Sequence, residues 1–211
     1  MSGLIDIVRC IHNAFRRDIL QIDDAAYGIA RSSGDLTHVF GRLDIIGEYL
    51  DYHAKGEEEA VFPAVDNIAP LVAKAYLIDH RELDTMVSGL KAMRTAPDAL
   101  TAARATAALA AHLRIHLYKE DAHLYPIVRE RTTEDDQAFI VGRMARKVPP
   151  DRTPTLVRWL FPLLGHDDRA VVTRGWMTLM PPQVFAGLKP LIREVVAGDW
   201  PELTRRIPAL E

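Results

Sequence analysis

The chain has 211 residues, a formal charge of −3 at pH 7, 48% apolar and 26% charged residues, and one cysteine, Cys10. This length can bury a core without disulfides, and a lone cysteine cannot form an internal disulfide, so we expect a reducing, cytoplasmic location. The slightly acidic balance argues against nucleic acid or an anionic membrane surface as a partner, and no apolar run is long enough for a transmembrane helix.

Helical periodicity dominates the first two thirds of the sequence. Apolar residues recur every three or four positions, as at Leu4, Ile7 and Ile11. Polar and proline-containing segments divide this part into four predicted helices, at residues 3–31, 36–67, 70–95 and 98–131. Short connections between long helices favour antiparallel neighbours, so we predict an all-α fold with an up-down-up-down four-helix bundle.

The last third of the chain has a different composition. Nine of the 13 prolines and all three tryptophans follow residue 148, whereas seven of the eight histidines precede residue 124. Shorter helices are predicted here, at about 134–146, 154–164, 167–180, 183–197 and 201–206. We therefore expect a bundle domain over residues 1–131 and a C-terminal helical extension over 132–211. The extension is predicted to pack on the bundle, where it closes one end or forms a homodimer surface.

Two segments of the predicted bundle repeat one another. Residues 57–65 read EEEAVFPAV and align without a gap with residues 120–128, which read EDAHLYPIV. Each copy places a proline inside a predicted helix, six residues after the first glutamate. A proline inside a helix costs about 3 kcal/mol, so its recurrence in one register indicates a fixed architectural feature.

Histidines accompany both copies at matching positions. One lies four residues before each first glutamate, and another lies in an apolar setting on the preceding helix. Residues four apart share one face of a helix, so each His-x-x-x-Glu pair can point towards the bundle axis. An isolated pair of this kind usually reflects only weak side-chain attraction, but its duplication favours a dinuclear iron or manganese site. The predicted metal ligands are His12, His53, Glu57, His80, His116 and Glu120.

On these residues, the sequence resembles the hemerythrin family, specifically the hemerythrin-like HHE cation-binding domain, over about residues 1–131. The resemblance implies a four-helix bundle around an oxo- or hydroxo-bridged non-heme di-iron centre. It also implies that one iron is held by His12 and His53, the other by His80 and His116, and that Glu57 and Glu120 bridge the pair. Residue type alone does not separate iron from manganese.

The sequence departs from the oxygen carriers of that family at one position. Those proteins have five histidines, two of them as H-x-x-x-H on the third helix, whereas Tyr76 and Asp84 flank His80 at this spacing. Water or another nearby side chain can fill the position, and the candidates are Tyr49, Tyr76, Asp84, His112 and His123. Asp121 is the alternative to Glu120, and we expect Glu58 and Glu59 to face solvent.

The sequence alone is compatible with three functions. The first is a di-iron oxidoreductase or detoxification protein that reacts with dioxygen, peroxide or nitric oxide as its small-molecule ligand. The second is a non-catalytic oxygen- or iron-binding sensor or store, and the third is a structural protein with metal-free histidines. We favour the first. An oxygen carrier limits access to its metals, whereas metal positions open to exchange favour reaction with a small ligand.

Overall fold

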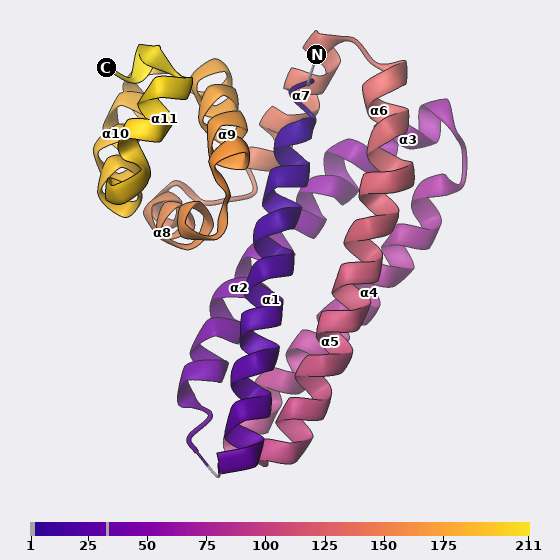
Figure 1. The fold of residues 1–211 in the computed structure, drawn as a ribbon. Coiled ribbons are helices and arrows are strands. Elements are labelled where there is room, and N and C mark those ends of the chain that lie inside the picture. Colours follow the sequence, from indigo (N-terminus) through magenta and orange to yellow (C-terminus); the bar gives the residue numbers. More distant parts are fainter. Residues whose placement is uncertain (1–2, 33) are drawn as a thin grey trace.

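The computed structural model describes residues 3–32 and 34–211. All regular elements within these ranges are helical, which confirms the all-α prediction. Each long helix of the bundle packs against two others: α1 against α2 and α5, and α4 against α2 and α5 (Figure 1). These helices are α1 (Asp6–Ser32), α2 (Thr37–Gly56), α4 (Val72–Ala92) and α5 (Ala99–Lys119). The first predicted helix begins too early, since residues 4 and 5 form a turn ahead of Asp6.

Two of the predicted long helices are not continuous α-helices. The segment predicted at 36–67 divides into α2, a π-helical turn η1 (Glu57–Val61) and α3 (Phe62–Ile68). The segment predicted at 98–131 divides in the same way into α5, the π-turn η3 (Glu120–Leu124) and α6 (Tyr125–Arg131). Both interruptions therefore begin at a glutamate of the sequence repeat.

The repeated prolines explain the position of these π-turns. Proline has no amide hydrogen, and in an α-helix its ring clashes with the carbonyl group four residues earlier. In each copy the chain widens just before Pro63 or Pro126, and the preceding residue donates its N–H five positions back. Phe62 donates to the Glu57 carbonyl oxygen, and Tyr125 donates to that of Glu120. The π-turn thereby accommodates the proline within the helix.

The helices of the last third agree with the predicted ranges within two residues. Thr133 and Asp136 form a reciprocal capping box that fixes the start of α7. The helices are α7 (Glu134–Ala145), α8 (Thr153–Leu163), α9 (His166–Leu179), α10 (Pro182–Val195) and α11 (Trp200–Arg206). None of the helices in the described ranges is long and apolar enough to span a membrane.

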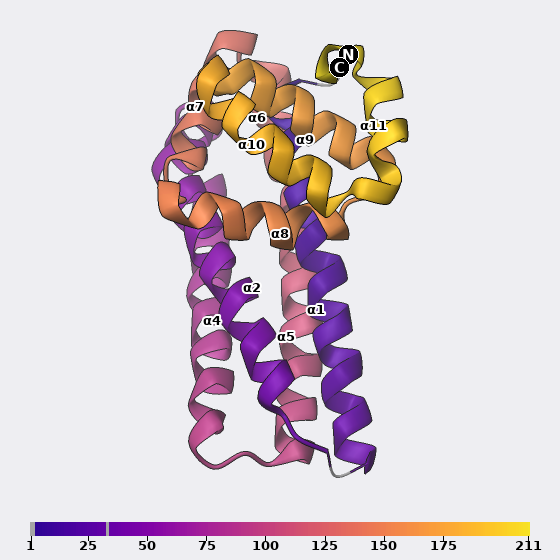
Figure 2. The ribbon, with the colours of Figure 1, turned by 90° about the vertical axis from the view of Figure 1, so that its left-hand side faces the viewer.

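Helices α8–α11 gather beside the end of α1 at which Asp6 lies, and the C-terminus lies at the same end (Figure 1). In the second view, α8 runs crosswise to the long helices (Figure 2). Both α8 and α9 contact α1, while α7 contacts α2 and η1. One apolar core joins Val61 and Leu124 of the bundle with Phe161 and Val172 of the last third. The domain division after residue 131 stays a prediction.

The candidate ligands lie between two apolar cores. On α1, His12 falls between Val8 of the core just described and Phe15 of a second core deeper in the bundle. On α4, His80 likewise falls between Tyr76 and Leu83, which belong to different cores. The fold therefore encloses a polar layer in apolar surroundings, where an unpartnered polar group is costly.

Candidate metal centre

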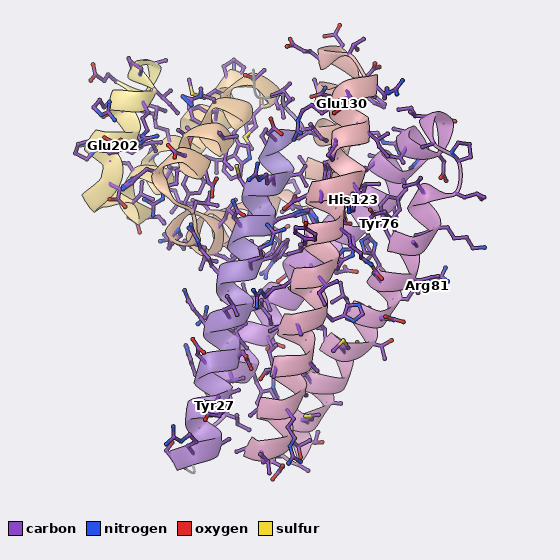
Figure 3. The ribbon with its side chains drawn as sticks, turned by 45° about the vertical axis from the view of Figure 1, so that its right-hand side comes forward. Tyr27, Tyr76, Arg81, His123, Glu130 and Glu202 are labelled. Carbon is purple, nitrogen blue, oxygen red and sulfur yellow. The ribbon has the colours of Figure 1, made fainter. Side chains whose placement is uncertain are left out.

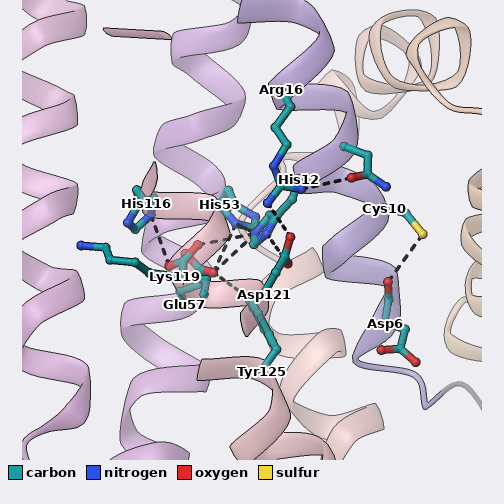
Figure 4. A network of polar contacts seen from close by, with 12 residues as sticks. Asp6, Cys10, His12, Arg16, His53, Glu57, His116, Lys119, Asp121 and Tyr125 are labelled. Carbon is teal, nitrogen blue, oxygen red and sulfur yellow. Dashed lines mark hydrogen bonds and ion pairs between the residues drawn. The ribbon is translucent and has the colours of Figure 1, made fainter. Parts of the chain in front are cut away.

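All six predicted ligands meet inside the bundle. Their ligand atoms form two groups, and within each group the atoms lie within 4.8 Å of one another. The first group is His12, His53, Glu57 and Glu120, and the second is Glu57, His80, His116 and Glu120. The two groups share both glutamates, and Figure 4 shows much of this network at the centre of the bundle.

Each glutamate presents one oxygen to each histidine pair. Glu57 Oε1 lies 3.2 Å from His53 Nε2, and Glu57 Oε2 lies 3.3 Å from His80 Nε2. Glu120 Oε2 lies 3.6 Å from His12 Nε2, and Glu120 Oε1 lies 3.2 Å from His116 Nε2. This is the arrangement in which two carboxylates can link two cations, each with its own pair of imidazoles.

The donor atoms of the cluster fit metal ions better than they fit one another. Four of its buried atoms lack a hydrogen-bond partner in the described residues: Glu57 Oε2, His80 Nε2 and both carboxylate oxygens of Glu120. Each unsatisfied buried group costs about 1–3 kcal/mol. Nitrogen and carboxylate donors together suit divalent transition metals, so a bound cation pair would satisfy these atoms.

Carboxylates orient three of the four imidazoles from outside. The Nδ1 atoms of His12 and His80 each lie 2.9 Å from a carboxylate oxygen, and that of His116 lies 3.2 Å from one. An ionised carboxylate only accepts, so it holds a proton on Nδ1 and turns Nε2 towards the interior of the cluster. Asp121 contacts His12, Glu58 contacts His80 and Asp79 contacts His116.

The outer ring bears on the expectations about three acidic residues. Asp121, the alternative to Glu120, contacts the outer nitrogen of His12 and belongs to neither ligand group. Glu58 is exposed, as expected, and its side chain also reaches His80 on the neighbouring helix. Glu59 is exposed, as expected, and pairs with Lys147, which follows the end of α7.

Tyr125 is a buried residue of the cluster that the sequence did not single out. Its hydroxyl donates to Glu57 Oε1, and its ring meets that of His12 edge-on at 5.5 Å. Burial raises the pKa of Tyr125 well above 10, so the hydroxyl keeps its proton and remains a donor. The repeat-equivalent residue, Phe62, stacks on His80 at 5.3 Å. In both copies of the repeat an aromatic residue directly precedes the proline, and this shared position could have identified both residues from the sequence.

Burial and mutual charge shift the protonation of the cluster in opposite directions. Burial opposes ionisation of Glu57, but His53 and His80 outweigh it and hold the Glu57 pKa well below its usual range. Burial, reinforced by the charge of Glu57, raises the pKa of Glu120 well above its usual range. Burial works against a charged His80, yet Glu120 and Glu57 raise its pKa to about 11, whereas burial lowers the pKa of His116 to about 4. Such opposed shifts are typical of functional sites.

Neither tyrosine considered for the fifth-histidine position belongs to a ligand group. The hydroxyl of Tyr49 donates to the carbonyl of Arg152 at 3.3 Å, and that of Tyr76 donates to the carbonyl of Lys119 at 3.2 Å. Both hydroxyl groups are therefore used by backbone acceptors.

The remaining candidates for that position also lie outside both groups. His112 is half-buried, with its Nε2 3.5 Å from Glu82 Oε2. Asp84 and His123 are exposed. Along the bundle, His123 lies at nearly the same level as Tyr76 (Figure 3). The described residues therefore supply no fifth imidazole to the cluster.

A cavity of about 230 Å³ leads to the histidines from between α2, α4 and α5. His53, His80 and His116 line it on the inside, while Leu50 and Asp84 contribute to its other walls. Pockets for drug-sized ligands usually measure about 300–1,000 Å³, so this one suits smaller molecules.

Comparison with known proteins gives the same assignment as the residues. The sequence model of the hemerythrin HHE cation binding domain matches residues 3–128. Zinc finger protein BRUTUS of Arabidopsis thaliana is 24% identical over 140 residues, which cover 64% of this chain and 11% of that protein. Two BRUTUS-like zinc finger proteins of the same plant are each 21% identical, over 81% and 76% of this chain and 14% of their own length. The chain thus spans a small part of these relatives, and no solved structure matches it.

Proposed function

The chain belongs to the family of hemerythrin HHE cation binding domains, and we propose that its six inward-facing side chains hold two iron ions that react with dioxygen, peroxide or nitric oxide. The single observation that supports this most is the sharing of Glu57 and Glu120 between two histidine pairs. A mononuclear site would use one such group and leave the other pair of imidazoles without a role.

Iron is the first choice of metal and manganese the second. Imidazole nitrogens favour iron over the hard cations that prefer oxygen alone, while two carboxylates balance the charge of a metal pair. His12 and His53 would hold one ion and His80 and His116 the other. When bound, the metal pair supplies redox chemistry to a small ligand.

The surrounding residues prepare the site for that ligand. Asp121, Glu58 and Asp79 fix the orientation of three imidazoles, and Tyr125 donates to Glu57. Such outer partners commonly contribute about 10–100-fold to metal affinity. The 230 Å³ cavity gives a small ligand access to three of the histidines and leaves too little room for a large organic substrate.

A non-catalytic binding module is the second candidate, and one observation favours it. The relatives match this chain along only 11–14% of their own length, so in them the matched segment forms one part of a much larger protein. A cation- or oxygen-binding module that serves other regions would fit that arrangement.

Metal stoichiometry tests the ligand assignment. Iron-loaded wild-type protein should contain two irons per chain, whereas His53→Ala and Glu120→Ala should lose the pair. Asp121→Ala is the matched control, since Asp121 neighbours Glu120 but reaches the cluster only at the outer nitrogen of His12, while its other oxygen pairs with Arg16. It should retain two irons at saturating metal. Retention of both metals in His53→Ala and Glu120→Ala would refute the assignment.

Turnover distinguishes the two functions once the metals are in place. Consumption of peroxide or reduction of nitric oxide over many cycles supports the reactive di-iron protein. A reversible oxygenated spectrum without turnover supports the binding module instead.

A further inference from the structure

A continuous series of aromatic contacts connects the candidate metal centre with the outside of the bundle. The ring of His53 contacts Phe15 at 5.4 Å, and Phe15 contacts Trp159 of α8 at 5.1 Å. Trp159 stacks on Tyr49 at 5.0 Å with an interplanar angle of 22°, and Tyr49 contacts half-buried Tyr52 at 6.1 Å. We propose that Trp159, Tyr49 and Tyr52 carry single electrons between the metal centre and the protein surface.

This inference rests on the proposed function, because it requires a redox-active centre behind His53. Tryptophan and tyrosine are among the side chains most readily oxidised by one electron, whereas phenylalanine is not. Phe15 therefore acts as packing between His53 and Trp159, and the electron crosses it without residing there. Trp159 is the first residue along the series that can hold the oxidation.

Polar partners of the aromatic residues suit this role. The indole Nε1–H of Trp159 donates to Asp18 Oδ2 at 2.7 Å, and Asp18, whose other oxygen pairs with Arg42, is only 2% exposed. A buried carboxylate at this distance stabilises positive charge on an oxidised indole. The hydroxyl of Tyr52 donates to Glu48 Oε1 at 2.9 Å, and Arg152 pairs with both oxygens of Glu48, so the phenol lies beside an ionised carboxylate that can accept its proton once the ring is oxidised.

Tyr49 has a different environment and a different role. Its hydroxyl donates to the backbone carbonyl of Arg152, and an amide carbonyl does not take up a proton at neutral pH. Oxidation of Tyr49 would leave its proton without an acceptor, so the Tyr49 ring transmits the electron between Trp159 and Tyr52.

Packing alone does not require an unbroken series that ends at a candidate ligand. Trp176, in the same part of the chain, contacts Phe161 at 5.4 Å and belongs to the apolar core that joins the last third to the bundle. Trp159 instead reaches across to α1 and α2. The proposal therefore gives α8 a function besides packing.

The proposed relay conserves electrons and protons. With iron bound and oxidised by peroxide, an electron would leave Trp159 for the centre, and the indole would keep its N–H proton against Asp18. Tyr52 then reduces the Trp159 cation radical through Tyr49, and the phenolic proton moves to Glu48. A one-electron reductant in solution, such as ascorbate, reduces the Tyr52 radical, and the proton returns from Glu48. Two such transfers, with two protons from solvent, match the reduction of one hydrogen peroxide to two waters.

Freeze-quench electron paramagnetic resonance of the full iron-loaded chain mixed with hydrogen peroxide tests this relay. Wild type should show a protein radical, and Trp159→Phe should lower its yield at least about tenfold, which corresponds to a barrier higher by about 1.4 kcal/mol. Trp176→Phe, the matched control, should keep the wild-type yield. Tyr52→Phe should instead prolong the Trp159 radical, because the residue that reduces it is lost.

Iron content and unfolding temperature, measured for each variant before peroxide is added, separate the two levels of the argument. Two irons per chain without any protein radical in wild type, or with an undiminished radical in Trp159→Phe, would overturn the relay and leave the metal centre intact. Failure of wild type to bind iron would overturn the proposed function and the relay together. If Trp159→Phe does not fold, an unchanged radical lifetime in Tyr52→Phe would overturn the relay by itself.

Discussion

Replacing Tyr125 by phenylalanine removes one hydroxyl from the metal cluster and keeps the buried ring. That hydroxyl donates to Glu57 Oε1, and a hydrogen bond to a charged group contributes about 1.5–3 kcal/mol. Loss of an outer partner of a metal ligand commonly weakens metal binding about 10–100-fold, which corresponds to about 1.4–2.8 kcal/mol. The two magnitudes agree, so we expect Tyr125→Phe to lower iron affinity by one to two orders of magnitude while two irons still bind at saturation.

A competition titration with a chelator of known affinity measures this effect under anaerobic conditions. Tyr76→Phe is the matched control, because it also removes a buried tyrosine hydroxyl, but one that donates to the backbone carbonyl of Lys119. This neutral hydrogen bond contributes about 0.5–1.5 kcal/mol to stability and touches no candidate ligand. Equal iron affinities of Tyr125→Phe, Tyr76→Phe and wild type would refute the role assigned to Tyr125.

Three further predictions concern stability, access and the thiol. Iron at 100 times its dissociation constant should raise the free energy of unfolding by about 2.7 kcal/mol per site in urea titrations, and equal stability with and without chelator would contradict metal binding by the folded state. Leu50→Trp, which fills the cavity wall, should slow nitric oxide binding in stopped-flow experiments at unchanged iron content; an unchanged rate would exclude this route. Burial, with the nearby charge of Asp168, raises the Cys10 pKa from 9.0 to about 12, so native protein should resist alkylation near neutral pH and react readily once unfolded. The raised pKa favours the folded state below pH 9, and this contribution disappears as the pH rises towards 12, so wild type should lose more stability over that range than Cys10→Ala. Parallel pH profiles would contradict the assigned burial.

The placement of the six candidate ligands follows from local rules that the sequence displays directly. A spacing of four puts His53 and Glu57 on one helical face, and the second copy of the motif does the same for His116 and Glu120. His12 and His80 are identifiable because each interrupts an apolar stripe that must face the bundle interior. Short connections then predict which helices are neighbours, whereas the assignment of one histidine pair to each iron came from the resemblance to the hemerythrin family.

The details of the site depend on tertiary packing and on backbone irregularity. The prolines indicated an irregularity of the helix in each repeat. They did not show that this irregularity would be a π-turn that starts at the glutamate. Side-chain reach between helices decides the outer ring, which is why the contact of exposed Glu58 with His80 was not predicted and why Asp79, next to His80 in the sequence, was not linked to His116. The spacing of residues along one helix does not show which residue of another helix a side chain will contact.

The last third of the chain shows the same limit. Proline and capping signals gave the helix boundaries within two residues, because they are local. The position of Trp159 against Phe15 and Tyr49 depends on how α8 crosses the bundle, and no periodicity in α8 encodes that.

Anomalous diffraction at the iron edge, on crystals of protein loaded with iron, tests the central claim most directly. The account predicts two peaks per chain, one between His12 and His53 and the other between His80 and His116, with Glu57 and Glu120 reaching both. A single peak, or none at these side chains despite iron in the crystal, would contradict it.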